Sequence, residues 1–363
     1  MSELARRREY SSNTIATLRS EFIGAAKFAA NKACVYATGS FGRCEASENS
    51  DLDLFIAGKS EKSVRSDGSE DFGQKNLLNH LDEICVQAEL IQAARRFGFP
   101  EFSGDGRYLD HHSVYEFTST LGTEKDDVAN TFTARLLLLL ESKPLLEDAV
   151  YGEIVMNVIE SYWRDYPDHQ ENFIPAFLAN DILRIWRTFC VNYEARTERE
   201  PEDKKASGKL KNYKLKHSRL LTCYSALLYL LAVHKCQKSV TPADALAMTK
   251  LTPTERLEWL RDQPDLPEAK NTIVNLLNQY DRFLETTNRK EEELVRQFLE
   301  SVRRLQAGLQ SFLSMRRIEA RRKNASAFRL RFSQSLASLR QRLSHAMVRS
   351  TIQRLGKTTN PLS

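Results

Sequence analysis

Strand-type sequence is confined to the first third of this 363-residue chain, and that uneven distribution limits the folds it can adopt. Short β-prone runs occur at residues 33–38, 52–56 and 107–114. Apolar residues at helical spacing fill the regions around them and nearly all of 126–314, with breaks such as Lys143-Pro144. The stretch 58–75 is rich in Ser, Lys, Glu, Asp and Gly and predicts a surface loop. We therefore expect an α+β fold, with a small mixed sheet first and only helices after residue 126.

Charged residues are also unevenly distributed along the chain. Residues 316–363 hold twelve Lys or Arg and one acid, a net charge of +11, whereas the rest holds 41 basic and 47 acidic residues, a net charge of −6. We expect three parts: a domain at 1–125 that contains the sheet, a helical domain at 126–315, and a basic C-terminal arm at 316–363 with helical spacing. Such an arm is a solubilising tail, a helix docked on the acidic body, or a contact to nucleic acid or another anionic surface.

Several classes of protein are disfavoured by the composition. The longest apolar run, 226–233, is far shorter than the roughly 20 residues of a membrane span. The first 30 residues carry no apolar core of a secretory signal. The six cysteines form no C-x-x-C pair, which favours scattered reduced thiols. We expect a cytoplasmic protein.

The stretch from Gly39-Ser40 to Asp51-Leu52-Asp53 carries the clearest chemical signal. Two aspartates at i and i+2 on a strand point to the same face, and carboxylate oxygens are ligands that Mg²⁺ prefers. A glycine at the end of the preceding strand lets backbone N–H groups approach a triphosphate, and the Ser40 hydroxyl adds a donor. This combination is typical of metal-dependent phosphoryl chemistry.

At these residues the sequence resembles the DNA polymerase β-type nucleotidyltransferase superfamily. The run Gly-Ser-Phe-Gly-Arg-Cys-Glu at 39–45, followed by Ser-Asp-Leu-Asp at 50–53, is most similar to the bacterial PII uridylyltransferase-like branch. Cys44 replaces the third glycine of that branch, a departure that leaves both carboxylates in place. The resemblance is specific over about 33–57.

The resemblance implies a nucleotide site at Gly39, Ser40 and Arg43, with Asp51 and Asp53 as catalytic metal ligands. It also implies a third carboxylate on a later strand, which acts as general base or completes a metal site. Asp110 best fits this position in catalysis and metal binding, with Glu101 and Asp105 as alternatives. The expected cofactor is Mg²⁺, or Mn²⁺, with a nucleoside triphosphate such as ATP as substrate.

Two helical segments offer cations to such a site. One places Asp181, Arg184 and Arg187 near one face, and the other carries Lys211, Asn212, Lys214, Lys216 and Arg219. Either face could hold a triphosphate tail or an acceptor.

The sequence therefore predicts a Mg²⁺-dependent enzyme that transfers an NMP from an NTP to a hydroxyl group and releases pyrophosphate. The acceptor stays open between a protein side chain, an RNA end and a second nucleotide. The alternative is a non-enzymatic module that binds nucleic acid or another anionic surface through residues 316–363.

Overall fold

A computed structural model describes residues 1–64, 70–102, 109–128, 130–197 and 212–288, together with 293 and 296. The chain divides into two compact units, Met1–Val295 and Arg296–Ser363, and every element named below belongs to the first. The basic arm at 316–363, Asp105 and Lys211 lie outside the described residues.

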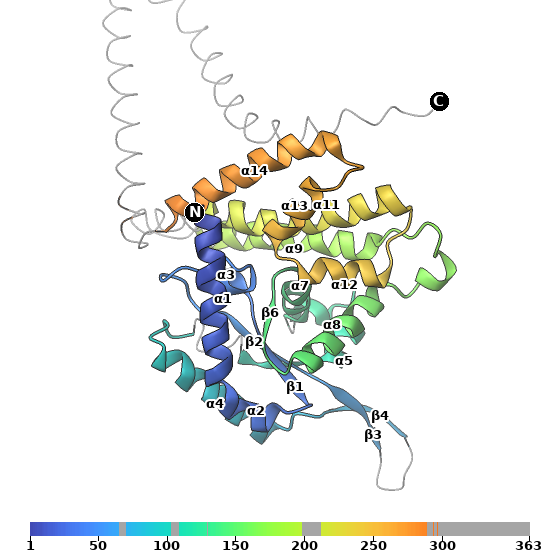
Figure 1. Cartoon of the computed structure of the whole chain (residues 1–363). Coiled ribbons are helices and arrows are strands. Elements are labelled where there is room, and N and C mark those ends of the chain that lie inside the picture. Colours follow the sequence, from blue (N-terminus) through green and yellow to red (C-terminus); the bar gives the residue numbers. More distant parts are fainter. Residues whose placement is uncertain are drawn as a thin grey trace, which may run out of the picture. The chain divides into compact units, whose positions relative to one another are not determined.

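A four-stranded mixed sheet forms the centre of the N-terminal half (Figure 1). Its order is β5-β2-β1-β6, with β1 (Ala33–Ala37), β2 (Leu54–Gly58), β5 (His111–Ser113) and β6 (Lys143–Leu146). β1 pairs antiparallel with β2 and β6, whereas β2 and β5 are parallel. With helices following the sheet, the predicted α+β fold class is confirmed.

Two elements differ from the sequence prediction. Residues after 126 are not purely helical, because β6 pairs with β1 at the edge of the sheet. Pro144 is tolerated there since an edge strand leaves one row of backbone groups unpaired. The predicted loop at 58–75 also contains strand residues: β3 (Ser60–Val64) and β4 (Glu70–Asn76) pair as a hairpin that extends from the sheet (Figure 1). Its polar strands lack the apolar alternation by which strands are predicted.

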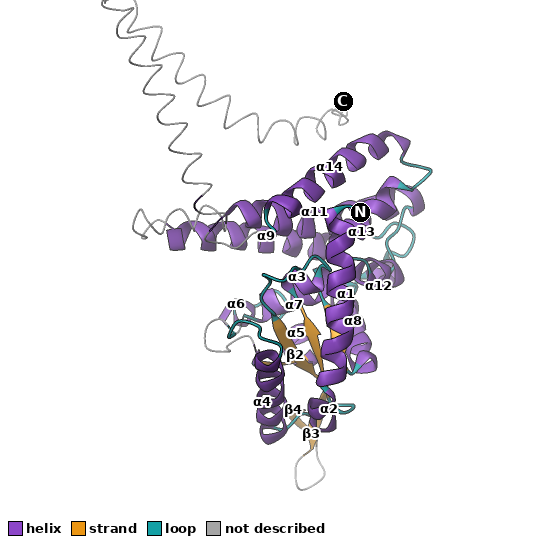
Figure 2. Ribbon diagram, turned by 60° about the vertical axis from the view of Figure 1, so that its left-hand side comes forward, coloured by secondary structure: helices purple, strands orange, loops and turns teal. Residues whose placement is uncertain are grey.

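Helices cover both faces of the central sheet (Figure 2). One face, with Val35 and Ile56, packs against α1 (Glu3–Glu21), α2 (Ile23–Ala29) and α4 (His80–Arg96). The other face, with Tyr36 and Phe55, packs against α5 (Val114–Ser119), α7 (Thr131–Leu140) and α8 (Asp148–Tyr162). Neighbouring strand residues therefore enter different cores, as the period of two in a strand requires. Two one-turn helices, α3 (Gly39–Gly42) and α6 (Lys125–Val128), complete this half.

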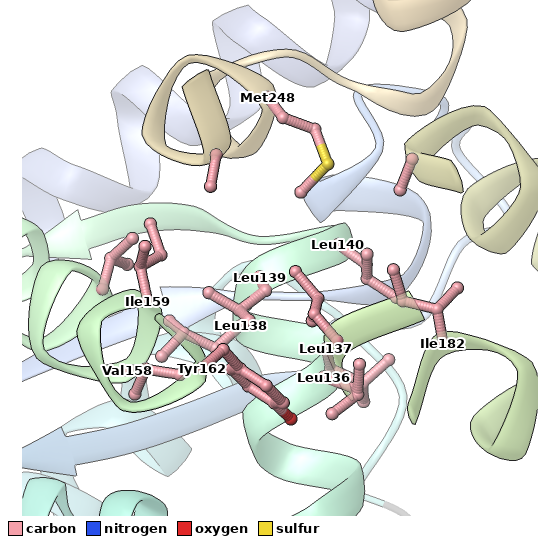
Figure 3. Packing of buried hydrophobic residues seen from close by; sticks show 14 of the residues in the cluster. Leu136, Leu137, Leu138, Leu139, Leu140, Val158, Ile159, Tyr162, Ile182 and Met248 are labelled. Atoms are coloured by element: carbon pink, nitrogen blue, oxygen red, sulfur yellow. The ribbon is translucent and has the colours of Figure 1, made fainter. Parts of the chain in front are cut away.

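The second core continues into the C-terminal half. Leu136–Leu140 of α7 belong to one apolar cluster with Ile182 and Met248 (Figure 3). The surrounding elements are η2 (Tyr166–Asp168), α9 (Ala176–Thr197), the π-helix η3 (Leu215–Arg219), α11 (Leu220–Gln237), α12 (Pro242–Lys250), α13 (Pro253–Arg261) and α14 (Pro267–Thr286). Nine of the ten residues of α7 are buried, including its five consecutive leucines, so it is suited to this central position. Within the described ranges, no helix is long and apolar enough to cross a membrane.

Candidate active site

A cavity of about 390 Å³ opens where the sheet meets the helices of the C-terminal half, here called the helical half. Its lining comes from the loop after β1, the segment before β2, η3, the end of α14, and α1. The lining residues are Arg7, Gly39, Ser40, Arg43, Glu45, Ser47, Asn49, Ser50, Asp51, Asp53, Lys214, Leu215, Ser218, Arg219, Phe283, Leu284 and Thr287. The structure thus brings five of the six predicted site residues to one cavity, and Asp110 is not among them.

The antiparallel pairing of β1 with β2 brings Gly39 to Asp53. The ladder extends one step beyond the strands, because the Thr38 N–H donates to the Asp53 carbonyl at 2.9 Å. Gly39 has φ +63°, a left-handed conformation that favours glycine, and a Cβ there would lie 2.4 Å from Asp53 Oδ2. A side chain at residue 39 would therefore displace the carboxylate.

Asp51 and Asp53 both reach the cavity, although β2 begins at Leu54 rather than at Leu52. Side chains nevertheless alternate along this segment, since Leu52 and Leu54 are buried whereas Asp51 and Asp53 face the cavity. Burial, and then the neighbouring charge of Asp51, raise the pKa of Asp53, while Arg219 and Arg43 oppose this shift. A partly buried carboxylate whose charge is disfavoured by a neighbouring carboxylate is an environment in which a divalent cation is favourable.

These two residues fit a Mg²⁺ site in their chemistry, since both are hard oxygen donors on one cavity. Because a Cβ at residue 39 would overlap the Asp53 carboxylate, only the backbone of Gly39 lies beside that carboxylate. Among the described residues, no group of three or more His, Cys, Asp or Glu side chains is placed to hold a metal. Any further ligands would come from the substrate and water, as is usual for Mg²⁺.

The loop after β1 positions Ser40, Arg43 and Cys44 differently. Ser40 Oγ is buried beside the cavity and has no hydrogen-bond partner in the described parts of the chain. Arg43 is also buried, and it donates to Glu45 Oε2 and Glu141 Oε2, each at 3.0 Å. Cys44 adopts φ +56°, so the loop keeps a left-handed residue where the resembling branch has glycine. Nucleotide contact by Ser40 and Arg43 stays a prediction.

The candidates for a third carboxylate lie elsewhere. Asp110 is exposed and directly precedes β5, and Asp53 directly precedes β2. Because these two strands are parallel, both residues lie at the same end of the sheet. It does not line the cavity. Glu101 is exposed and accepts two hydrogen bonds from Arg95, at 2.8 and 3.1 Å. The role of Asp110 therefore stays a prediction.

Of the two cationic helical segments, the second reaches the cavity. Lys214 and Arg219 line it, and Arg219 is close enough for Asp53 and Asp51 to favour its charged form. Burial and then Arg43 lower the pKa of Arg219 to about 10, which leaves it protonated at neutral pH. In the first segment, Asp181 accepts from Tyr162 Oη at 2.8 Å and Arg184 pairs with Asp127. None of these lines the cavity.

Three supporting residues were not predicted from the sequence. Glu45 accepts from Arg43 and from Tyr280 Oη, the latter at 2.7 Å. Glu141 binds Arg43 across 98 positions of sequence, and Arg7 donates to the carbonyl oxygen of Glu45 at 3.0 Å. A signal exists for Glu141, because an acid directly after five leucines ends a helix that is otherwise core.

Comparison with known proteins agrees with this geometry. Residues 19–97 match a family described as "Nucleotidyltransferase domain", a range that includes the loop after β1 and both aspartates. No curated protein and no solved structure matches the chain. Residues 19–97 are thus similar to a nucleotidyltransferase domain, and this likeness supports transfer of an NMP in general.

Proposed function

We propose that the chain is a Mg²⁺-dependent nucleotidyltransferase, which transfers an NMP from an NTP to a hydroxyl acceptor and releases pyrophosphate. The single observation that carries this proposal is the cavity that joins Asp51 and Asp53 to cations from the helical half. Asp51 and Asp53 would hold the metal, with Mn²⁺ as an alternative to Mg²⁺. When bound, the metal neutralises phosphate charge and stabilises the attacking and leaving oxygens.

The residues around the aspartates support a polyphosphate at this place. Gly39 leaves the loop backbone uncovered, and the Ser40 hydroxyl is available as a donor. Arg219 of η3 and Lys214, which directly precedes η3, face the same space and supply positive charge for phosphate oxygens. Asp110, at the same end of the sheet, is our proposal for the residue that activates the attacking hydroxyl.

The acceptor is proposed as a class, a hydroxyl of a protein side chain, an RNA end or a second nucleotide. Relationship to the PII uridylyltransferase-like branch rests on the run at 39–45 and stays a proposal. Residues 316–363, with their net charge of +11, are proposed to guide an anionic acceptor such as RNA.

A labelling experiment tests the proposal. The full chain is incubated with each α-labelled NTP and Mg²⁺, with RNA or with whole lysate, and products are separated on gels. We expect a labelled acceptor with wild type and none with Asp51→Ala/Asp53→Ala. No labelled species with any NTP or acceptor would reject the enzyme, and salt-sensitive RNA binding that is indifferent to Asp53 would favour the binding module.

A further inference from the structure

Glu141 occupies an unusual place behind the cavity. It directly follows α7 and is only 2% exposed. Its carboxylate accepts hydrogen bonds from Arg43 Nη1 at 3.0 Å and from Thr222 Oγ1 at 2.9 Å, and it forms an ion pair with Arg219. One buried acid therefore connects the loop after β1, the helix α11 and the π-helix η3.

The backbone of Glu141 braces the same loop. A Cβ at Gly42 would lie 2.0 Å from the Glu141 carbonyl oxygen, so the loop and the end of α7 are in direct backbone contact. The loop that carries Gly39 and Ser40 cannot move relative to Glu141 without breaking this contact. Side chain and backbone of one residue thus fix the position of the loop.

Arg219 is held from behind and faces the cavity in front. Its guanidinium lies 5.1 Å from the Phe189 ring and pairs with Glu141, while its side chain keeps 23% exposure. A π-helical turn, a feature common at functional sites, places Ser218 and Arg219 on the cavity, together with Lys214 directly before it. A guanidinium has five N–H donors, so pairing with one carboxylate leaves donors for another anion.

We infer that Glu141 is a positioning residue, which holds Arg219 in the orientation that binds the polyphosphate of the substrate. This inference rests on the proposed function, since it assigns Arg219 to the polyphosphate of that same site. A fixed guanidinium loses little conformational freedom on binding, and this strengthens the contact. Glu141 itself does not touch substrate, because Arg43, Thr222 and Arg219 surround its carboxylate.

The test measures binding rather than turnover. The affinity of the full chain for inorganic tripolyphosphate with Mg²⁺ is compared between wild type and Glu141→Gln, at a temperature where both are folded. We expect binding to weaken about ten- to a hundredfold, the effect of removing the negative charge that pairs with Arg219. Thr222→Val, which removes one neutral donor to Glu141, should weaken binding about two- to tenfold and serves if Glu141→Gln fails to fold.

A matched control separates positioning from stability. Asp126 is an equally buried acid that accepts from Arg135 at 2.8 and 2.6 Å, and neither residue lines the cavity. Asp126→Asn should lower the melting temperature and leave tripolyphosphate affinity unchanged. In an Arg219→Gln background, Glu141→Gln should have a much smaller effect on affinity, because only its contacts to Arg43 and Thr222 are then weakened.

The inference is overturned if Glu141→Gln lowers stability without weakening tripolyphosphate binding, or if its effect persists in full in the Arg219→Gln background. The proposed function fails separately. If no NMP is transferred to any acceptor, the proposed function is rejected. The tripolyphosphate measurements then still test whether Glu141 positions Arg219.

Discussion

At the scale of single residues, Asp53 has conflicting roles in stability and in binding. Burial and the charge of Asp51 raise its pKa, so the charged form is disfavoured in the folded, metal-free protein. Gly39 approaches so closely that no side chain separates the loop from the carboxylate. A group that costs stability in this way is typical of a site shaped for a ligand.

Asp53→Asn should therefore stabilise the metal-free protein by up to about 1 kcal/mol at neutral pH, since it removes a repulsive charge without changing shape. The pKa of Asp53 in the folded state lies above its usual value of 3.8, so wild-type stability falls as pH rises through that raised pKa. The advantage of Asp53→Asn should disappear at lower pH, where Asp53 is protonated. Urea unfolding of both proteins across pH in EDTA measures this, and a less stable variant at neutral pH would contradict the account.

At the scale of elements, the site depends on close contacts between segments that are distant in sequence. The loop after β1 lies against the end of α7 with no room for a side chain at Gly42. The helix α7 is held in place by its buried leucines, so its end is a rigid surface for the loop. The contact therefore transmits the position of the helical half to the residues that face the cavity.

Gly42→Ala should lower the free energy of unfolding by about 1–3 kcal/mol, because the added methyl overlaps the Glu141 carbonyl. Gly152 in α8 is the control, since a Cβ there meets nothing within 4 Å. Gly152→Ala should stabilise the protein by about 1 kcal/mol through helix propensity. Chemical denaturation of both variants distinguishes the two effects, and an equal response at the two glycines would exclude the close contact.

The same elements show which features are predictable from sequence. Gly39, Ser40, Asp51 and Asp53 fall within one strand–loop–strand unit, so their spacing was sufficient to bring them together. The pairing of Arg43 with Glu141 and of Glu141 with Arg219 spans roughly a hundred and eighty positions in two steps, and no local pattern encodes it. The edge strand β6 is not predictable from local sequence, because Pro144 normally ends regular structure.

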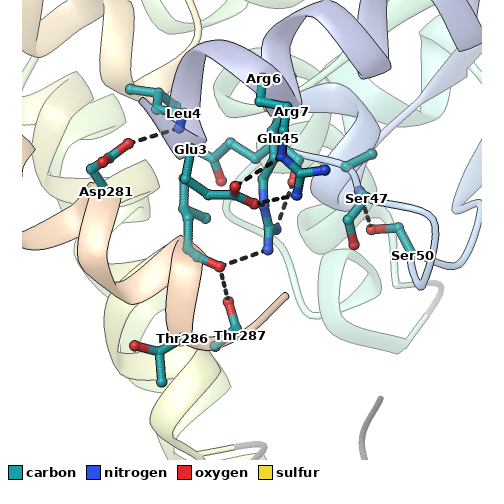
Figure 4. A network of polar contacts seen from close by, with 12 residues as sticks. Glu3, Leu4, Arg6, Arg7, Glu45, Ser47, Ser50, Asp281, Thr286 and Thr287 are labelled. Carbon is teal, nitrogen blue, oxygen red and sulfur yellow. Dashed lines mark hydrogen bonds and ion pairs between the residues drawn. The ribbon is translucent and has the colours of Figure 1, made fainter. Parts of the chain in front are cut away.

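At the scale of the compact unit Met1–Val295, α1 joins the sheet to the last helices. Arg7 donates to the carbonyl oxygens of Glu45 at 3.0 Å and Leu284 at 2.7 Å, and its Nε donates to Glu3 (Figure 4). The Leu4 N–H donates to Asp281 Oδ1 at 2.7 Å in α14. The N-terminal helix α1 thus closes one side of the cavity through Arg7.

Arg7→Met should destabilise the protein by about 3 kcal/mol, because it removes the charged donor that the buried carbonyl groups of Glu45 and Leu284 share. Arg6→Met is the matched control, since Arg6 is half exposed and pairs only with Glu3 within the described parts of the chain. Its effect should stay within about 0.5 kcal/mol. Melting temperatures of the two variants measure this difference. A similar loss of stability in both variants would show that α1 does not brace the cavity.

The central claim is that Asp51 and Asp53 serve transfer of an NMP, and the position of the label tests it most directly. The full chain is given the same NTP labelled at the α- or at the γ-phosphate, beside Asp53→Asn as a folded control. The account predicts that α-label joins the acceptor while γ-label leaves as pyrophosphate, and that Asp53→Asn does neither. Transfer of γ-label to the acceptor, or α-label transfer that survives Asp53→Asn, would contradict it.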